Sequence, residues 1–258
     1  ELATSSKEIF SNKKGGDSKS ASNRKIESNL FSHVLSQPSI YSTEDIYTAS
    51  LVPVVIDFVG DSSQLVSKIE SSGGAIYLDR DSFLVATVPS DLLEHISIFE
   101  EVLRISMPKS SYNSSSNIPS NTHNSDAWHT REIKGNGVKI GIIDGGFVGL
   151  SELMGTELPS SVNTLCFYAP FQSTLNSFYC EYSSAHGTAV LESTFDIAPA
   201  ATYYISNPKT QIETLEAVEW MVQNDVEIIN HSAEFHPYGP GDGTSPIPHD
   251  IINIVDYA

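Results

Sequence analysis

Two residues of this chain, Asp144 and His186, have the types and neighbours that acid–base chemistry needs. Asp144 follows the apolar run from Val138 to Ile143, which is bounded by glycine-containing turns. His186 opens the segment His-Gly-Thr-Ala-Val. A carboxylate can hold an imidazole in one tautomer and stabilise its protonated form. The pair therefore predicts a histidine general base that is oriented by an aspartate.

The elements around this pair predict how the two side chains are held. Residues 138–143 form a short, mostly apolar run with several β-branched side chains, which is typical of a strand buried on both faces of a parallel sheet. Asp144 then lies at the carboxyl end of that strand, where open α/β sheets build their sites. Residues 189–195 can form a helix that is bounded by Pro199, so His186 is predicted at the start of a rigid element.

Four segments together resemble the subtilases, the subtilisin-like serine peptidases. They are Gly-Val-Lys-Ile-Gly-Ile-Ile-Asp ending at Asp144, His-Gly-Thr-Ala-Val from His186, Asp-Ile-Ala-Pro-Ala-Ala at 196–201, and Val-Glu-Ile-Ile-Asn-His-Ser ending at Ser232. The resemblance covers residues 126–258. It implies that Asp144 and His186 are the orienting residue and the general base of an Asp-His-Ser triad, in an endopeptidase that needs no cofactor for catalysis.

The same resemblance implies where a polypeptide substrate binds. Ser232, Ala233 and Glu234 are expected to line the cleft and to pair with an extended peptide as an added strand. Many subtilases have Thr or Ser where this chain has Gly145, and often have Gly where it has Glu234. These departures keep an alternative open, namely a catalytically inactive, subtilase-like protein that binds peptides or acts at the cell surface.

The family's nucleophile lies in a Gly-Thr-Ser-x-Ala-x-Pro segment at a helix start, and no such segment occurs in this sequence. Ser245 does lie in a Gly-Thr-Ser sequence, but Pro246 and Pro248 would interrupt a helix that began there. We therefore expect the chain to stop, at Ala258, before the serine nucleophile. The 258 residues are then expected to be inactive by themselves.

Residues 51–108 carry a different pattern, in the order strand, helix, strand, strand, helix, strand. This is the split βαβ order of a small ferredoxin-like α+β module. Upstream of a subtilase domain it resembles the family's pro-domain, which inhibits the enzyme and sends its C-terminal tail through the cleft. On that resemblance residues 105–109 would approach the active site. A permanent accessory domain is the alternative.

The remaining segments complete the predicted organisation. Residues 1–50 are rich in Ser, Asn, Lys and Gly and are predicted to be disordered. Residues 109–125 form a Ser/Asn-rich linker, which is a plausible processing site. Residues 126–258 alternate strands and helices, which predicts the N-terminal part of a three-layer, parallel-sheet α/β domain.

The composition limits which classes of partner and which cellular compartment are expected. The chain has 14 basic and 32 acidic residues, a net charge of −18, which disfavours nucleic acid because phosphate contacts need Lys and Arg. No apolar run is long enough to predict a transmembrane segment. The chain begins with Glu1 rather than Met, so we expect that an upstream part was removed or not included. Together with the resemblance this predicts a secreted or cell-surface protein.

Cys166 and Cys180 lie 14 residues apart, just before His186. In an oxidising compartment they could close a small loop that leads into the histidine, and two free thiols are the alternative. Calcium is a common structural stabiliser in the resembled family. No spacing of acidic residues predicts a particular site for it, so no metal ligand is predicted.

Overall fold

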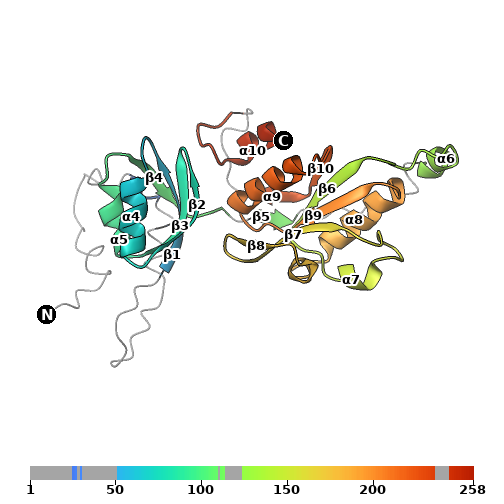
Figure 1. The fold of residues 1–258 in the computed structure, drawn as a ribbon, viewed down its shortest axis with the longest axis horizontal. Helices are drawn as coiled ribbons and strands as arrows, with labels where there is room; N and C mark the ends of the chain where they lie inside the picture. The colour runs from blue at the N-terminus through green and yellow to red at the C-terminus, as the bar shows by residue number, and fades with distance from the viewer. Residues whose placement is uncertain (1–24, 28–29, 31–50, 110, 114–123, 236–243) are drawn as a thin grey trace, which may run out of the picture. The chain divides into compact units, whose positions relative to one another are not determined.

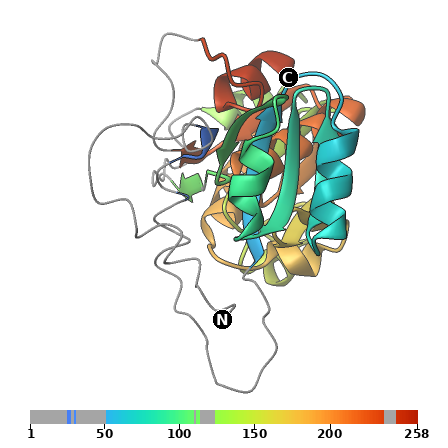
Figure 2. The same cartoon turned by 90° about the vertical axis from the view of Figure 1, so that its left-hand side faces the viewer.

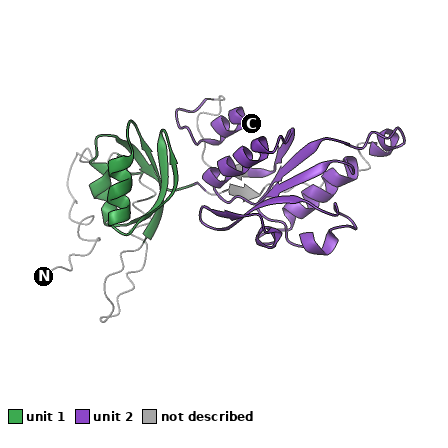
Figure 3. Ribbon diagram, in the orientation of Figure 1, with its two compact units in different colours: residues 1–108 green, residues 109–258 purple. Residues whose placement is uncertain are grey.

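The computed structural model describes residues 25–27, 30, 51–109, 111–113, 124–235 and 244–258. The chain divides into two compact units, residues 1–108 and residues 109–258 (Figure 3). Each unit has its own sheet and its own core of buried side chains.

Unit 1 is a four-stranded antiparallel sheet with strand order β2-β3-β1-β4. Its elements are β1 (Leu51–Phe58), α4 (Ser63–Ser71), β2 (Ala75–Arg80), β3 (Phe83–Pro89), α5 (Leu92–Ser97) and β4 (Val102–Ser106). Both helices lie in front of the sheet in Figure 2. Leu65 and Ile69 of α4 stand one turn apart and share a core with Ile96 of α5, which explains why both helices cover the same face.

Part of the range expected to be disordered belongs to unit 1. Ile26 forms a parallel bridge with Ile105 of β4, and Glu27 N donates to Ile105 O at 2.9 Å. Ile26 is 4% exposed and Leu30 is fully buried. For these residues the expectation is corrected. Two apolar side chains in a polar segment give no periodic signal, but the edge of β4 offers a backbone partner at Ile26, and both side chains enter the core of unit 1.

Unit 2 contains a five-stranded sheet with strand order β10-β6-β9-β7-β8. Strands β10, β6, β9 and β7 are parallel, and β8 is antiparallel to β7. The elements in chain order are β5 (Ser111–Asn113), α6 (Ser125–His129), β6 (Lys139–Ile143), α7 (Leu150–Leu153), β7 (Asn163–Ala169), β8 (Gln172–Thr174), the 3₁₀ helix η2 (Ser177–Cys180), α8 (His186–Ile197), β9 (Thr202–Ser206), α9 (Gln211–Gln223), β10 (Ile228–His231), β11 (Ala233–Phe235) and α10 (Ile251–Tyr257).

Helices α8 and α9 cover opposite faces of this sheet (Figure 1). Ile140 and Ile142 of β6 pack in one core cluster with Leu191 of α8. Gly141, between them, points the other way, since a Cβ built on it would lie 2.4 Å from Met221 Sδ of α9. The alternation along β6 therefore gives three layers, as the alternation of strands and helices in the sequence indicates.

The start of α9 is fixed by a reciprocal cap. Glu213 N donates to Thr210 Oγ1 at 3.3 Å, which is a capping-box contact. The Glu213 carboxylate accepts from Lys209 N at 2.7 Å and from Phe171 N at 3.1 Å. Burial raises the pKa of Glu213, while these donors act in the opposite direction. One buried side chain thus joins the β7–β8 turn to α9.

The burial of Leu30 generates a testable expectation. Leu30→Ala should lower the free energy of unfolding of unit 1 by about 2 to 5 kcal/mol, because it removes a fully buried side chain and leaves a cavity. Hydrogen exchange of unit 1 peptides across a urea series measures this without interference from unit 2. Ile98→Ala, at a position that is 65% exposed, is the matched control and should change little. Equal protection in both variants would contradict the packing of Leu30.

Candidate functional site

Asp144 lies at the carboxyl end of β6 and is held from both sides. Its backbone N–H donates to Ser206 O at 3.1 Å, which continues the pairing with β9. Its side chain is fully buried, and Oδ1 accepts from Gly145 N at 2.7 Å. Oδ2 is left to meet the imidazole.

His186 is the first residue of α8, and its side chain is 16% exposed. His186 Nδ1 lies 2.7 Å from Asp144 Oδ2. An ionised carboxylate only accepts hydrogen bonds, so the neutral imidazole carries its proton on Nδ1 and offers Nε2 as a proton acceptor. The backbone N–H of His186 donates to Ser184 Oγ at 3.0 Å, which fixes the start of the helix. The structure brings the two sequence-predicted residues together.

The environment of Asp144 acts on its acidity in two directions. Burial raises the pKa of the carboxyl, because removal from water disfavours the charged form. Hydrogen bonds from His186, Gly145 and Gly146 lower it again. The carboxylate is therefore kept dry while its charge is stabilised by specific donors.

Two glycines permit the close packing around this pair. A Cβ on Gly146 would lie 1.9 Å from Tyr182 O and 2.8 Å from Ser184 N, both backbone atoms. A Cβ on Gly187 would lie 2.6 Å from Gly146 O and 2.9 Å from the Asp144 Cβ. Gly187 N donates to Gly146 O at 3.0 Å. The turn after Asp144 and the start of α8 can approach this closely only without side chains.

Cys166 and Cys180 are joined by a disulfide bond in the structure. Cys166 lies on β7 and Cys180 ends η2, so the bond closes the segment that leads toward α8. Cys180 O accepts from Phe147 N at 2.8 Å. The closed segment therefore contacts the turn that follows Asp144.

Ser232, Ala233 and Glu234 follow β10, which is the neighbour of β6 in the sheet. Ser232 N donates to Ile143 O at 3.2 Å, so this segment starts beside the end of β6. Beyond it β11 pairs antiparallel with β5, with Ala233 opposite Asn113 and Phe235 opposite Ser111. An extended segment of the chain itself thus lies along the strand that we expected to bind peptides.

This pairing corrects the description of residues 109–125 as a linker without secondary structure. Residues 111–113 form a strand there, because their backbone pairs with β11. The polar sequence of the segment gives no sign of this pairing. Residues 105–109 were expected to approach the active site. Of these, Ser106 ends β4, and Lys109 contacts Gln211 and Asp250 of unit 2. The segment that reaches β11 lies further along the chain.

Ser245 is not a partner of His186 among the described residues. Its Oγ donates to Asp250 Oδ2 at 2.6 Å and accepts from Ile247 N at 3.2 Å. The prediction from Pro246 and Pro248 agrees with this placement, since α10 starts only at Ile251.

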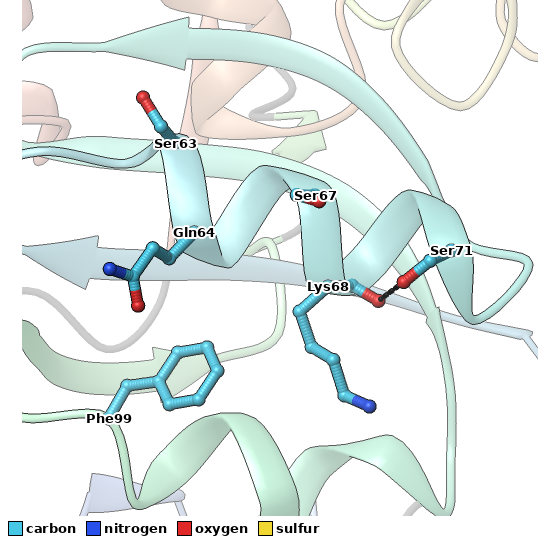
Figure 4. Close-up of a pocket in the computed structure, with 6 residues that line it drawn as sticks. All are labelled: Ser63, Gln64, Ser67, Lys68, Ser71 and Phe99. Atoms are coloured by element: carbon cyan, nitrogen blue, oxygen red, sulfur yellow. Dashed lines mark hydrogen bonds between the residues drawn. The ribbon is translucent and has the colours of Figure 1, made fainter.

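The described residues contain no group of three or more His, Cys, Asp or Glu side chains arranged to hold a metal ion. Nor does the described part of the chain contain a helix long and apolar enough to cross a membrane. An open depression in unit 1 is lined by polar side chains of α4 and by Phe99 (Figure 4). It includes none of the predicted site residues.

Comparisons with known proteins give a partial likeness. No family model and no curated protein matches the sequence. One similar solved structure is fervidolysin from Fervidobacterium pennivorans, described as a keratinolytic enzyme related to subtilisin, with a TM-score of 0.47 and 10% identity. Another is the epidermin leader peptide processing serine protease EpiP from Staphylococcus aureus, with a TM-score of 0.46 and 9% identity.

The matches cover 75% and 72% of this chain but only 38% of fervidolysin and 51% of EpiP. The chain therefore spans about half or less of the length of these proteins. At TM-scores below 0.5 the likeness is limited, and the proposal below stands on the residues of the site.

Sequence reasoning missed several residues that shape the site. Ser184, Gly146 and the strand at 111–113 are the main ones. Gly145-Gly146 was interpreted as a turn, and Gly145 as a departure from the resembled family, although small residues directly after a predicted strand-end carboxylate also indicate close backbone approach. The strand at 111–113 carries no local signal, because its partner is more than one hundred residues away.

Gly146 generates a prediction about the geometry of the pair. Gly146→Ala should displace the 182–184 backbone and lower the free energy of unfolding of unit 2 by about 1 to 3 kcal/mol or more, because backbone atoms cannot yield to a methyl group. Proton NMR of the His186 ring in wild type and variant measures the loss of the hydrogen bond to Asp144. Gly137→Ala, where nothing lies within 4 Å but φ is +82°, separates this effect from backbone strain, because Gly146 is not among the glycines with a positive φ. An unchanged His186 signal in Gly146→Ala would contradict the prediction.

The raised pKa of Asp144 generates a prediction about pH. The folded state holds this proton more tightly than the unfolded chain, so the free energy of unfolding falls as pH rises from the ordinary value near 3.8 through the raised pKa. Asp144→Asn removes this cost. We expect the variant to gain stability relative to wild type as pH rises from 4 to 8. Urea midpoints of unit 2 at the two pH values test this, and a constant difference between the proteins would refute it.

Proposed function

We propose that this chain supplies the orienting carboxylate and the general base of a serine-type endopeptidase. The observation that carries the proposal is the 2.7 Å contact between His186 Nδ1 and Asp144 Oδ2. The carboxylate is fully buried and the imidazole is partly exposed. This is the arrangement in which a histidine can take a proton on Nε2 while the aspartate stabilises the charge that forms on the ring.

In the proposed reaction a serine hydroxyl attacks the carbonyl carbon of the scissile peptide bond. His186 Nε2 takes the hydroxyl proton, and the resulting tetrahedral intermediate expels the amine, to which His186 returns the proton. Water then attacks the acyl-enzyme with the same general-base help, and the serine is regenerated. No described serine hydroxyl hydrogen-bonds the His186 ring, and the proposal takes the nucleophile from outside these 258 residues. The reaction needs no cofactor.

The proposed substrate is a polypeptide bound in extended form along β11. Backbone pairing between β11 and β5 supports this, because it demonstrates an edge that accepts an antiparallel strand next to the end of β6. Main-chain bonds of this kind hold a peptide without reading its side chains. Ser232, Ala233 and Glu234 are the residues of the wall in this proposal.

We further propose that unit 1 is a pro-domain and that the protein is made as a zymogen. Residues 111–113, close to the start of unit 2, occupy the strand edge that a substrate would need. A chain that fills its own binding edge excludes other peptides until the linker is cut. In this proposal the mature enzyme acts outside the cytoplasm, where the Cys166–Cys180 bond is stable. Structural calcium stays a prediction, checked by unfolding with and without a chelator.

A second function is favoured by the same pairing. Since β11 can bind an extended strand without any catalysis, a subtilase-like peptide-binding protein with no working nucleophile would use the same edge. In that case peptides would bind to the protein after its linker has been cut, but no peptide bond would be hydrolysed. Substitution of His186 would then have no effect on turnover.

The decisive test is His186→Ala in the protein that includes the nucleophile. We expect peptidase activity to fall by roughly 10⁴- to 10⁶-fold, because the members of a triad act as a unit. Turnover of a quenched fluorescent peptide measures it. Ser193→Ala, at an exposed position on the same helix α8, is the matched control and should retain full activity. Unchanged turnover in the His186 variant would sink the proposal.

A further inference from the structure

Unit 2 holds a lysine side chain against a buried carboxylate. Lys109 Nζ lies 3.2 Å from Asp250 Oδ1. Asp250 is only 3% exposed, and its second oxygen accepts from Ser245 Oγ at 2.6 Å. A buried carboxylate that loses its cation is left uncompensated, which is costly. An ammonium group at this position is therefore energetically favoured.

The backbone at Lys109 is held separately from the side chain. Lys109 N donates to Gln211 Oε1 at 2.6 Å, and Lys109 O accepts from Gln211 N at 3.2 Å. Gln211 is the first residue of α9 and is 1% exposed. These two bonds would form with any residue at this place in an extended chain, whereas Asp250 distinguishes a cation from other side chains.

The Asp250 carboxylate contacts Lys109 and does not cap the helix that follows it. Asp250 is the N-cap residue of α10, where an aspartate usually accepts from a backbone N–H of the first turn, yet its side chain makes no such bond. Asn253 Nδ2 donates to Ser245 O at 3.2 Å and to Ile247 O at 2.7 Å, which braces the loop that carries Ser245. The carboxylate is thus positioned by its surroundings before a cation arrives.

The lysine site and the β11 edge hold the same stretch of chain. Four positions after Lys109, Asn113 lies opposite Ala233 of β11. The stretch runs antiparallel to β11, so it travels toward Ser232, whose N–H bonds the carbonyl just before Asp144. A peptide bound in this way places its lysine at least four residues before the part that reaches the Asp144–His186 pair.

We propose that Asp250, whose second oxygen is bonded by Ser245, is a recognition site for a lysine side chain of an extended polypeptide bound along β11, that Gln211 holds the backbone at that lysine, and that Lys109 occupies this site in cis. The inference rests on the proposed binding of polypeptide along β11 and not on catalysis. The net charge of −18 also favours basic ligands and disfavours acidic ones. The site would give the protein a preference for lysine well upstream of the cleaved bond.

The test uses the full chain with its own segment weakened. Lys109→Ala empties the site, and Ser111→Pro with Asn113→Pro weakens the cis strand, because proline donates no ladder hydrogen bond. The probe is a fluorescein-labelled peptide with the sequence of residues 107–113, Met-Pro-Lys-Ser-Ser-Tyr-Asn, against the same peptide with norleucine in place of lysine. Fluorescence anisotropy gives both dissociation constants. We expect the lysine peptide to bind at least about tenfold more tightly.

With Asp250→Asn added to the same chain, the dissociation constants of the lysine and norleucine peptides should agree to within about twofold. The negative charge that attracts the ammonium group is then absent. Equal binding of the two peptides before this change would overturn the lysine site and leave the strand-binding edge intact. A lysine preference that survives Asp250→Asn, or no binding of either peptide, also overturns it. Since the readout is binding, it is independent of the His186→Ala result.

A second arm covers the case in which Asp250→Asn does not fold. In the otherwise unaltered chain, Lys109→Met should speed hydrogen exchange of the segment that starts at residue 109, while Lys109→Arg should exchange more slowly than Lys109→Met, because it keeps a positive charge beside Asp250. Lys134→Met removes an exposed ion pair with Glu132 and is the matched control. If Lys109→Met exchanges like the control, the side chain does not hold the segment, and the proposal fails.

Discussion

The site depends on a charge that unit 2 keeps away from water. Asp144 is fully buried at the end of β6, and its carboxylate is tolerated because donors surround it. Each donor depends on another part of the fold: β9 fixes the backbone of Asp144, the turn at Gly146 approaches it, and α8 delivers His186. A loss of any of these contacts would leave the carboxylate with the cost of burial and without its compensation.

A second buried carboxylate, Asp250, gives the same unit a separate requirement. Asp144 is compensated by His186 of α8 and by the turn that follows Asp144, whereas Asp250 is compensated by Lys109, the first residue of unit 2. Residues 111–113 then cover the edge of β11. Backbone pairing and one charged side chain therefore both hold this stretch of unit 2, and the proposed peptide site depends on these two contacts.

The sequence predicted most of what depends on local pattern. The strand before Asp144 and the helix after His186 follow from apolar period, glycine placement and residue type, and they lie where expected to within a few residues. Strand β7 and the packing of Ile26 and Leu30 were missed. Their apolar residues lack a clear period, and distant partners stabilise them. The Lys109–Asp250 contact joins residues 141 apart, so no local signal could announce it.

The opposite placement of α8 and α9 has a consequence for the hand of the fold. The connections from β7 to β9 and from β9 to β10 both step across the sheet toward β10, yet their helices lie on opposite faces. Two parallel crossovers of this kind must have opposite hands, so one of them is left-handed, whereas about 98% of such connections are right-handed. If both followed the common hand, the two helices would compete for one face and leave the other bare. Strand twist favours the common hand, so it does not account for the left-handed crossover. Contacts between segments that are distant in the sequence must stabilise it.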